Sequence, residues 1–165
     1  ITLDFYGGRK WGSKNSVIFY GQHYHSLDDK GRVIIPSLFR DLAFLEGEER
    51  KFVLTLASGE EKNLYMLPLK EWAKKVEAFN KLQTLGPQLK NHYRFFFGMA
   101  HVAELDRHNR ISIPDYLKEK TGFEKDIVFV GVNKHIEIWS SSNWQEFSRQ
   151  NHQDLDPLTQ ILYQG

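Results

Sequence analysis

The stretch LDDKGRVIIP, residues 27–36, is almost repeated as LDRHNRISIP, residues 105–114. The alternating apolar segments at 51–57 and 63–69, which follow the first copy, also have counterparts at 126–132 and 135–139. The residues that recur at the same spacing within the two copies are Leu27, Asp28, Arg32, Ile35 and Pro36, and Leu105, Asp106, Arg110, Ile113 and Pro114. Such self-similarity over a long period indicates duplication of one supersecondary unit.

Each copy predicts a tight turn between two short strands. The residue before the arginine is Gly31 in one copy and Asn109 in the other, the two residue types that most readily adopt a positive φ. Pro36 and Pro114 end the following strand and suit the first turn of a helix. We therefore predict the order strand, turn, strand, short helix, strand, strand, helix, occurring twice.

The repeat predicts two modules joined by a helical connection. We place the first module at 18–72, the connection at 73–97 and the second module at 98–146, with a C-terminal tail over 147–165. Within 69–79, apolar residues recur at helical spacing, and Gly86-Pro87 breaks the segment before a second helix. Residues 1–17 are turn-rich and basic without regular periodicity, and we expect them to be a flexible leader.

The composition is that of a folded, soluble protein. Of the 165 residues, 41% are hydrophobic and 26% charged, and the net charge is +1. A net charge this small leaves a nucleic-acid partner open, because the position of the charges matters more than their sum. The chain has no cysteine, which excludes disulfides and thiolate metal sites. It also shows no apolar stretch of membrane-spanning length, and we expect a cytoplasmic protein.

The repeated Asp-x-x-x-Arg pattern has two interpretations. In the first, the aspartate and arginine form a salt bridge that ties the turn together, which at a surface contributes about 0–1 kcal/mol. In the second, the aspartate orients the guanidinium, whose free N–H groups face a phosphate or a guanine edge. The two roles are compatible, because an oriented arginine recognises a partner better than a mobile one.

The tandem motif, the order of the modules and the run GxxxHxLDxKGRxxIP at 21–36 resemble the MraZ family, part of the wider AbrB-like, swapped-hairpin group of prokaryotic transcription factors. The resemblance covers about residues 18–149. It implies an α+β, mainly β fold: a pseudo-twofold swapped-hairpin, or double-split, β-barrel built from two tandem AbrB-like modules with flanking helices.

The same resemblance implies a function. The family's members are sequence-specific regulators of transcription that bind double-stranded DNA, at repeated promoter boxes, as ring-like homo-oligomers. Their usual target is the division and cell-wall gene cluster, including their own gene. We therefore expect a nucleoid-associated regulator that acts on transcription, as a repressor for example.

In the first module the family's DNA-contacting arginine matches Arg32. It is preceded by Lys30 and Gly31, and Asp28 is in place to orient it. The resemblance therefore makes Lys30 and Arg32 the foremost candidates for DNA binding, with Asp28 and Gly31 shaping the turn.

In the second module Arg110 and Asp106 match the family pattern, but His108 replaces the lysine and Asn109 replaces the glycine. This departure puts equal use of the two modules in doubt. We rank Arg110 behind the first-module pair and place His108 and Arg107 last, with Asp106 and Asn109 as turn-shaping residues.

The other residue patterns in the sequence give no support for an enzyme. The sequence has no phosphate-binding glycine loop and no nucleophile elbow. His23 and His25 share a strand face, yet metal binding would need a third ligand that the sequence does not identify. We expect no metal, no cofactor and no small-molecule substrate, and no membrane partner. The aromatic residues that we assign to packing rather than to stacking on nucleic acid are Phe52, Trp72, Phe129, Trp139, Trp144 and Phe147.

Two alternative functions remain beside the regulator. One is an oligomeric, protein-binding scaffold in which the arginine turns make subunit contacts. The other, which has less support, is a hydrolase that uses histidine or carboxylate side chains. Loss of DNA binding in Arg32→Ala, with an intact oligomer, would separate the regulator from the scaffold.

Overall fold

The computed structural model describes residues 18–45, 47–57, 61–81 and 86–151. The predicted leader over 1–17 and the tail beyond residue 151 lie outside the described residues. The first half of the chain contains β1 (Gln22–Ser26), β2 (Arg32–Ile34), α1 (Ser37–Ala43), β3 (Lys51–Leu56), β4 (Asn63–Pro68) and α2 (Leu69–Asn80). The second half contains α3 (Pro87–Gly98), β5 (His101–Glu104), β6 (Arg110–Ser112), α4 (Asp115–Thr121), β7 (Asp126–Val132), β8 (His135–Ser140) and α5 (Ser141–Asn151).

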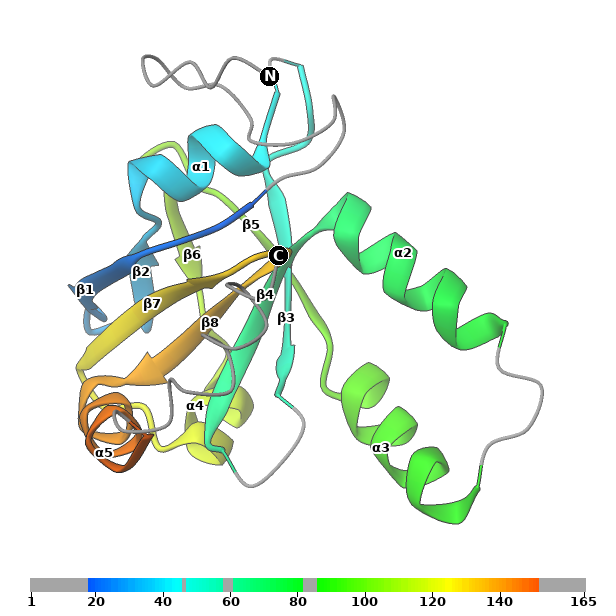
Figure 1. Cartoon of the computed structure of the whole chain (residues 1–165). Coiled ribbons are helices and arrows are strands. Elements are labelled where there is room, and N and C mark those ends of the chain that lie inside the picture. Colours follow the sequence, from blue (N-terminus) through cyan, green and yellow to red (C-terminus); the bar gives the residue numbers. More distant parts are fainter. Residues whose placement is uncertain (1–17, 46, 58–60, 82–85, 152–165) are drawn as a thin grey trace, which may run out of the picture.

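The strands of the two modules interleave (Figure 1). One six-stranded antiparallel sheet has the order β1-β7-β8-β4-β3-β5, and a two-stranded ribbon pairs β2 with β6. Replacing every strand by its counterpart in the other module gives the same sheet order reversed, which is the signature of pseudo-twofold symmetry. Because β1 pairs with β7 and β5 with β3, each module lends its first strand to the other. The predicted α+β, mainly β class and the swapped tandem modules are confirmed.

The core lies between the ribbon and the sheet. Val33 and Ile111 face each other across the ribbon and are each 1% exposed. Phe39 of α1 and Leu117 of α4 are fully buried in the same cluster. Full burial of a side chain of this size contributes about 1.5–3 kcal/mol. Since both modules supply residues to one core, the packing energy that stabilises one module also holds the other.

The aromatic residues assigned to packing do pack. Phe52, Phe129 and Trp139 are buried. Trp144 and Phe147 of α5 lie against a smaller buried cluster that contains Trp139, with ring centroids 5.5 Å and 5.0 Å from the Trp139 ring. These rings are therefore engaged within the protein rather than displayed as a platform for bases.

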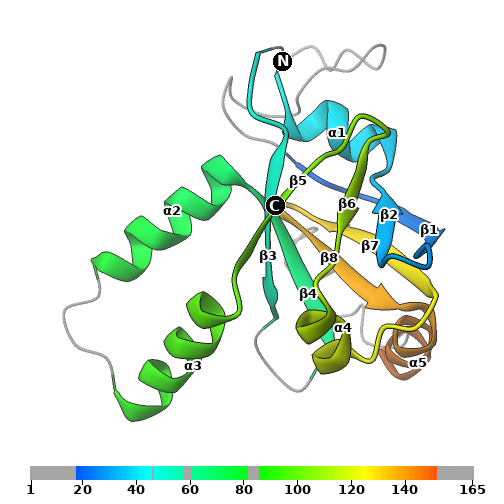
Figure 2. The ribbon, with the colours of Figure 1, turned by 180° about the vertical axis from the view of Figure 1, so that it is seen from behind.

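Helices α2 and α3 extend away from the sheet on one side of the molecule, as Figures 1 and 2 show from opposite directions. Their facing surfaces meet through aromatic rings: Trp72 stacks on Phe96 at 5.3 Å, and Phe79 contacts Tyr93 at 5.7 Å. Helix α2 begins at Leu69, inside the range predicted for the first module, and α5 crosses the predicted boundary between residues 146 and 147. The module boundaries therefore stay a prediction.

None of the helices in the described part of the chain combines the length and the apolar character needed to cross a membrane.

Candidate nucleic-acid interface

The two repeated turns have the same backbone structure. In the first, the N–H of Gly31 donates to the carbonyl of Asp28 and the N–H of Asp28 donates to the carbonyl of Arg32, both at 2.8 Å. In the second, the corresponding bonds join Asn109 to Asp106 and Asp106 to Arg110, both at 2.9 Å. Gly31 has a φ of 69° and Asn109 a φ of 61°. The positive φ predicted at these positions is confirmed, and it explains why glycine and asparagine occur there.

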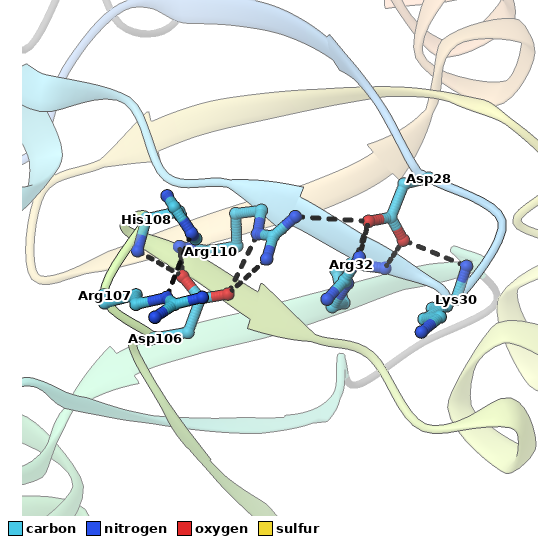
Figure 3. A network of polar contacts seen from close by, with 7 residues as sticks. All are labelled: Asp28, Lys30, Arg32, Asp106, Arg107, His108 and Arg110. Atoms are coloured by element: carbon cyan, nitrogen blue, oxygen red, sulfur yellow. Dashed lines mark hydrogen bonds and ion pairs between the residues drawn. The ribbon is translucent and has the colours of Figure 1, made fainter.

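In the first turn, one carboxylate organises both the backbone and the arginine (Figure 3). Oδ1 of Asp28 accepts the backbone N–H of Lys30 at 3.0 Å and of Arg32 at 2.9 Å. Oδ2 accepts the Arg32 Nε at 2.8 Å and lies 2.7 Å from its Nη2. The aspartate therefore fixes the turn with one oxygen and aims the guanidinium with the other.

The second turn repeats this arrangement. Oδ1 of Asp106 accepts the N–H of His108 at 2.8 Å and of Arg110 at 2.9 Å, and Oδ2 accepts the Arg110 Nε at 2.9 Å. The Arg110 Nη2 lies 2.8 Å from the same oxygen. The match extends to each donor and acceptor, so the sequence repeat encodes a repeated arrangement of charges as well as a repeated backbone.

The ribbon brings the two turns into one surface. Arg32 begins β2 and Arg110 begins β6, and because the strands are antiparallel the turns lie at opposite ends of the ribbon with the arginines between them (Figure 3). Val33 and Ile111 point inward, so the neighbouring positions on each strand point outward. Nη1 of Arg110 lies 3.6 Å from Oδ2 of Asp28, which joins the two modules by an ion pair.

These contacts shift the titration of the carboxylates. The pKa of Asp28 is lowered from 3.8 to about 2, chiefly by the hydrogen bond from the Arg32 side chain. The pKa of Asp106 is lowered to about 2, chiefly by the backbone N–H of Arg110. The Arg32 pKa is raised by its bond to Asp28. Both aspartates are therefore ionised at neutral pH, and Arg32 remains a cation.

The basic side chains of this surface are accessible. The Arg32 side chain is 32% exposed, and among the described residues its Nη1 has no hydrogen-bond partner. The Arg110 side chain is 24% exposed and is held by both aspartates. Lys30, Arg107 and His108 are exposed, and Nε of Arg107 donates to Nε2 of His108 at 3.2 Å. Arg32 thus has the greater freedom to donate to a partner.

The structure brings together all the residues predicted for the site and adds two that the sequence did not suggest. Arg50, which precedes β3, donates from Nη2 to the Oδ1 of Asn109. Lys118 of α4 lies beside Gly31, where a Cβ at residue 31 would come 2.7 Å from the lysine Nζ. Both come from the opposite module, so only the strand pairing places them near the turns.

The paired histidines of β1 face apolar partners. The His23 ring lies 4.9 Å from the Phe39 ring, and the His25 ring 5.7 Å from the Phe129 ring. The His25 pKa is lowered, mainly by burial and then by the neighbouring His23. Within the described ranges, no three His, Cys, Asp or Glu side chains are grouped so that they could hold a metal ion.

Comparison with known proteins places the chain in a family. The family model described as "MraZ protein, putative antitoxin-like" matches residues 18–86 and 96–160. The chain is 36% identical over 145 residues to the Transcriptional regulator MraZ of Acetivibrio thermocellus, a match that covers 88% of this chain and 96% of the relative. Identity to the protein of the same name from Clostridium beijerinckii is 40%, with the same coverage, and to that of Thermoanaerobacter sp. (strain X514) 41%, covering 86% of this chain and 94% of the relative. With the two-part family match and the duplicated fold agreeing, the chain belongs to the MraZ family.

Proposed function

We propose that this chain is a sequence-specific, double-stranded DNA-binding regulator of transcription. The observation that carries the proposal is the pair of arginines, Arg32 and Arg110, each oriented by its own aspartate on one exposed ribbon. A guanidinium held in a fixed plane matches two acceptors at once, either phosphate oxygens or the O6 and N7 of guanine. Relatives named as transcriptional regulators support the biological role.

The first turn makes the larger contribution to binding. Arg32 keeps a terminal nitrogen without a partner in the described structure, and Lys30 beside it is exposed. Arg110 is engaged by two carboxylates and is less exposed. The order proposed from the sequence, Lys30 and Arg32 before Arg110, with His108 and Arg107 last, agrees with this difference in freedom.

A ring-like homo-oligomer would compensate for the small charge of each protomer. The net charge of the chain is +1, and each copy presents only two short turns. Several copies on repeated promoter boxes bind as a linked set, which raises affinity by about 10²–10⁴ over a single contact. Salt dependence would be steep, because each neutralised phosphate releases counterions.

The biological setting of the proposal follows from the family. The target is the division and cell-wall gene cluster with the protein's own gene, and the protein acts in the cytoplasm on the nucleoid. Catalysis, cofactors and small-molecule substrates have no part in this role.

The test is a gel-shift titration with the duplex that lies upstream of the chain's own gene. We compare wild type, Arg32→Ala and Arg149→Ala. Arg149 is the matched control, since its Nη2 lies 2.6 Å from Glu146 on α5 and the variant removes the same charge and the same kind of ion pair elsewhere. We expect Arg32→Ala to lose the shift while keeping its oligomeric state, and Arg149→Ala to bind as wild type.

Two results would contradict the proposal. If Arg32→Ala dissociates the oligomer and wild type gives no shift, the arginine turns make subunit contacts and the protein is a scaffold. If all three proteins shift the duplex equally, the arginine turn does not form the DNA-binding surface.

A further inference from the structure

Arg50 of the first module anchors the second turn at two points. The N–H of Leu105, at the start of the turn, donates to the carbonyl of Arg50 at 2.9 Å. Near the end of the turn, the Arg50 Nη2 donates to the side-chain Oδ1 of Asn109. One residue from the opposite module therefore contacts the turn on both sides of Asp106 and His108.

The first turn has only half of this anchor. The N–H of Leu27 donates to the carbonyl of Lys125 at 2.8 Å, so Lys125 is the pseudo-symmetric counterpart of Arg50. Gly31 occupies the position of Asn109 and has no side chain to accept a bond. In the described part of the chain, no hydrogen bond joins the Lys125 side chain to the first turn. The two turns share a backbone but differ in how the opposite module holds them.

This asymmetry gives a reason for the asparagine. Glycine satisfies the positive φ at this position without strain, and Asn109 satisfies it at some cost. What asparagine adds is an acceptor within reach of Arg50. A hydrogen bond across modules restricts the turn that carries His108 and Arg110, and a restricted turn loses less entropy when a partner binds.

We propose that Arg50 is a positioning residue for DNA recognition, which holds the second turn in its binding conformation through Asn109. The proposal rests on the proposed function and extends it. Arg50 acts on the loop that presents Arg107, His108 and Arg110, and it makes the second turn the rigid one. The first turn, with glycine at the same position, is the adaptable one.

The first experiment needs no DNA. Amide hydrogen exchange is measured on the full chain for wild type, Arg50→Ala, Asn109→Gly and Arg94→Ala. Arg94 is the matched control, because its Nη1 makes the same kind of bond to the Oδ1 of Asn91 at 3.1 Å on α3. We expect faster exchange at residues 109 and 110 in Arg50→Ala and Asn109→Gly, and no change at residues 31 and 32. In Arg94→Ala we expect no change at either turn.

The second experiment is a double-mutant cycle on affinity for the upstream duplex. We expect Arg50→Ala to weaken binding by on the order of fivefold, the effect of one hydrogen bond. Asn109→Gly should weaken binding similarly, and the double variant no more than the stronger single variant. The slope of log affinity against log salt should be unchanged in Arg50→Ala, because a positioning residue neutralises no phosphate.

The outcomes separate this proposal from the proposed function. If the slope of log affinity against log salt is shallower by about one in Arg50→Ala, then Arg50 contacts a phosphate directly and the positioning role is overturned. Full additivity of the two substitutions, or wild-type exchange at Asn109 in Arg50→Ala, would overturn it as well. If wild type binds no duplex, the proposed function fails and a role of Arg50 in DNA recognition fails with it, while the exchange result still decides whether Arg50 holds the turn.

Discussion

Asp28 of the first module and Arg110 of the second are joined across the ribbon, with 3.6 Å between Oδ2 and Nη1. The same Asp28 oxygen also accepts the Nε of Arg32 at 2.8 Å. One carboxylate therefore pairs with an arginine from each module, whereas Asp106 forms its ion pair with Arg110 of its own turn. The proposed DNA-binding surface is pseudo-symmetric in its residues and asymmetric in the ion pairs that join them.

The coupling predicts unequal effects of two equivalent substitutions. Asp28→Asn and Asp106→Asn each remove one negative charge, so any general gain in attraction for DNA is the same in both. Asp28→Asn should lower the affinity ratio between the upstream duplex and a scrambled duplex by about tenfold, because a misaligned guanidinium loses its discrimination between bases. Asp106→Asn should lower the ratio less. Gel-shift titration of the upstream and scrambled duplexes with each variant measures this affinity ratio.

Asp126→Asn is the control for that comparison. Its carboxylate accepts a hydrogen bond from the hydroxyl of Ser26 at 2.8 Å and is exposed, so the variant changes the charge without touching either arginine. The ratio should stay at the wild-type value. If the affinity ratio falls equally in Asp28→Asn and Asp106→Asn, the ion pair between Asp28 and Arg110 has no role in discrimination between DNA sequences.

The lowered carboxylate pKa values predict a specific acid response. The pKa of Asp28 and of Asp106 falls from 3.8 to about 2 on folding, so the ionised forms favour the folded state above pH about 4. This contribution disappears as the pH falls through about 2. In urea titrations between pH 5 and 2, the free energy of unfolding should decline more steeply for wild type than for the double variant Asp28→Asn/Asp106→Asn. If the two plots of unfolding free energy against pH are parallel, the lowered pKa values of Asp28 and Asp106 are contradicted.

Gly31 should be required both for stability and for binding. An alanine there must adopt a φ near 69° and places its Cβ 2.7 Å from Lys118 Nζ and 3.3 Å from the carbonyl oxygen of Ile113. The left-handed conformation alone costs about 1–2 kcal/mol. Gly122 has a φ of 67°, but a Cβ at residue 122 would meet no atom of the described residues within 4 Å, so Gly122→Ala carries the conformational cost alone.

Urea unfolding of the two alanine variants should therefore rank Gly31→Ala as the less stable. Only Gly31→Ala should weaken binding to the upstream duplex, since Gly122 ends α4 and is not part of either repeated turn. Comparable binding losses in the two variants would mean that the measured effect is general destabilisation.

The shared core predicts a sharp contrast between neighbours on the ribbon. Ile111 is 1% exposed and packs in the cluster that both modules build, and Ile34 is 50% exposed on the opposite face of the ribbon. Ile111→Ala should cost about 2–5 kcal/mol of unfolding free energy. Ile34→Ala should stay within about 0.5 kcal/mol of wild type. Chemical denaturation of both variants measures these free energies. A similar loss of stability in both variants would contradict the burial of Ile111 in the shared core.

The sequence predicted the elements of this fold better than their pairing. The apolar runs at 51–57 and 126–132 lie within one residue of β3 and β7, because buried strands have continuous apolar sequences. Strand periodicity carries no information about pairing partners, so only the family resemblance implied that the modules interleave, as the pairing of β1 with β7 shows. The predicted module limits at residues 72 and 146 fall inside α2 and α5, because apolar periodicity marks the buried face of a helix and not the boundary of a module.

In the candidate site, too, the sequence predicted the local contacts but not those between distant residues. The local contacts of Asp28 and Arg32 follow from a spacing of four residues across a turn, which a sequence displays directly. The roles of Arg50 and Lys118 depend on residues that are far apart in the chain and meet only through the interleaved modules. Asparagine in place of glycine at residue 109 was the one visible sign of an additional contact.

The most direct measurement is the salt dependence of binding to the upstream duplex, for wild type and Arg32→Ala at matched oligomeric state. Each phosphate contact contributes about −0.9 to the slope of log affinity against log salt. We predict a steep negative slope for wild type, and for Arg32→Ala a weaker affinity with a shallower slope. A flat wild-type plot, or identical lines for the two proteins, would contradict the claim that the aspartate-oriented arginines bind DNA.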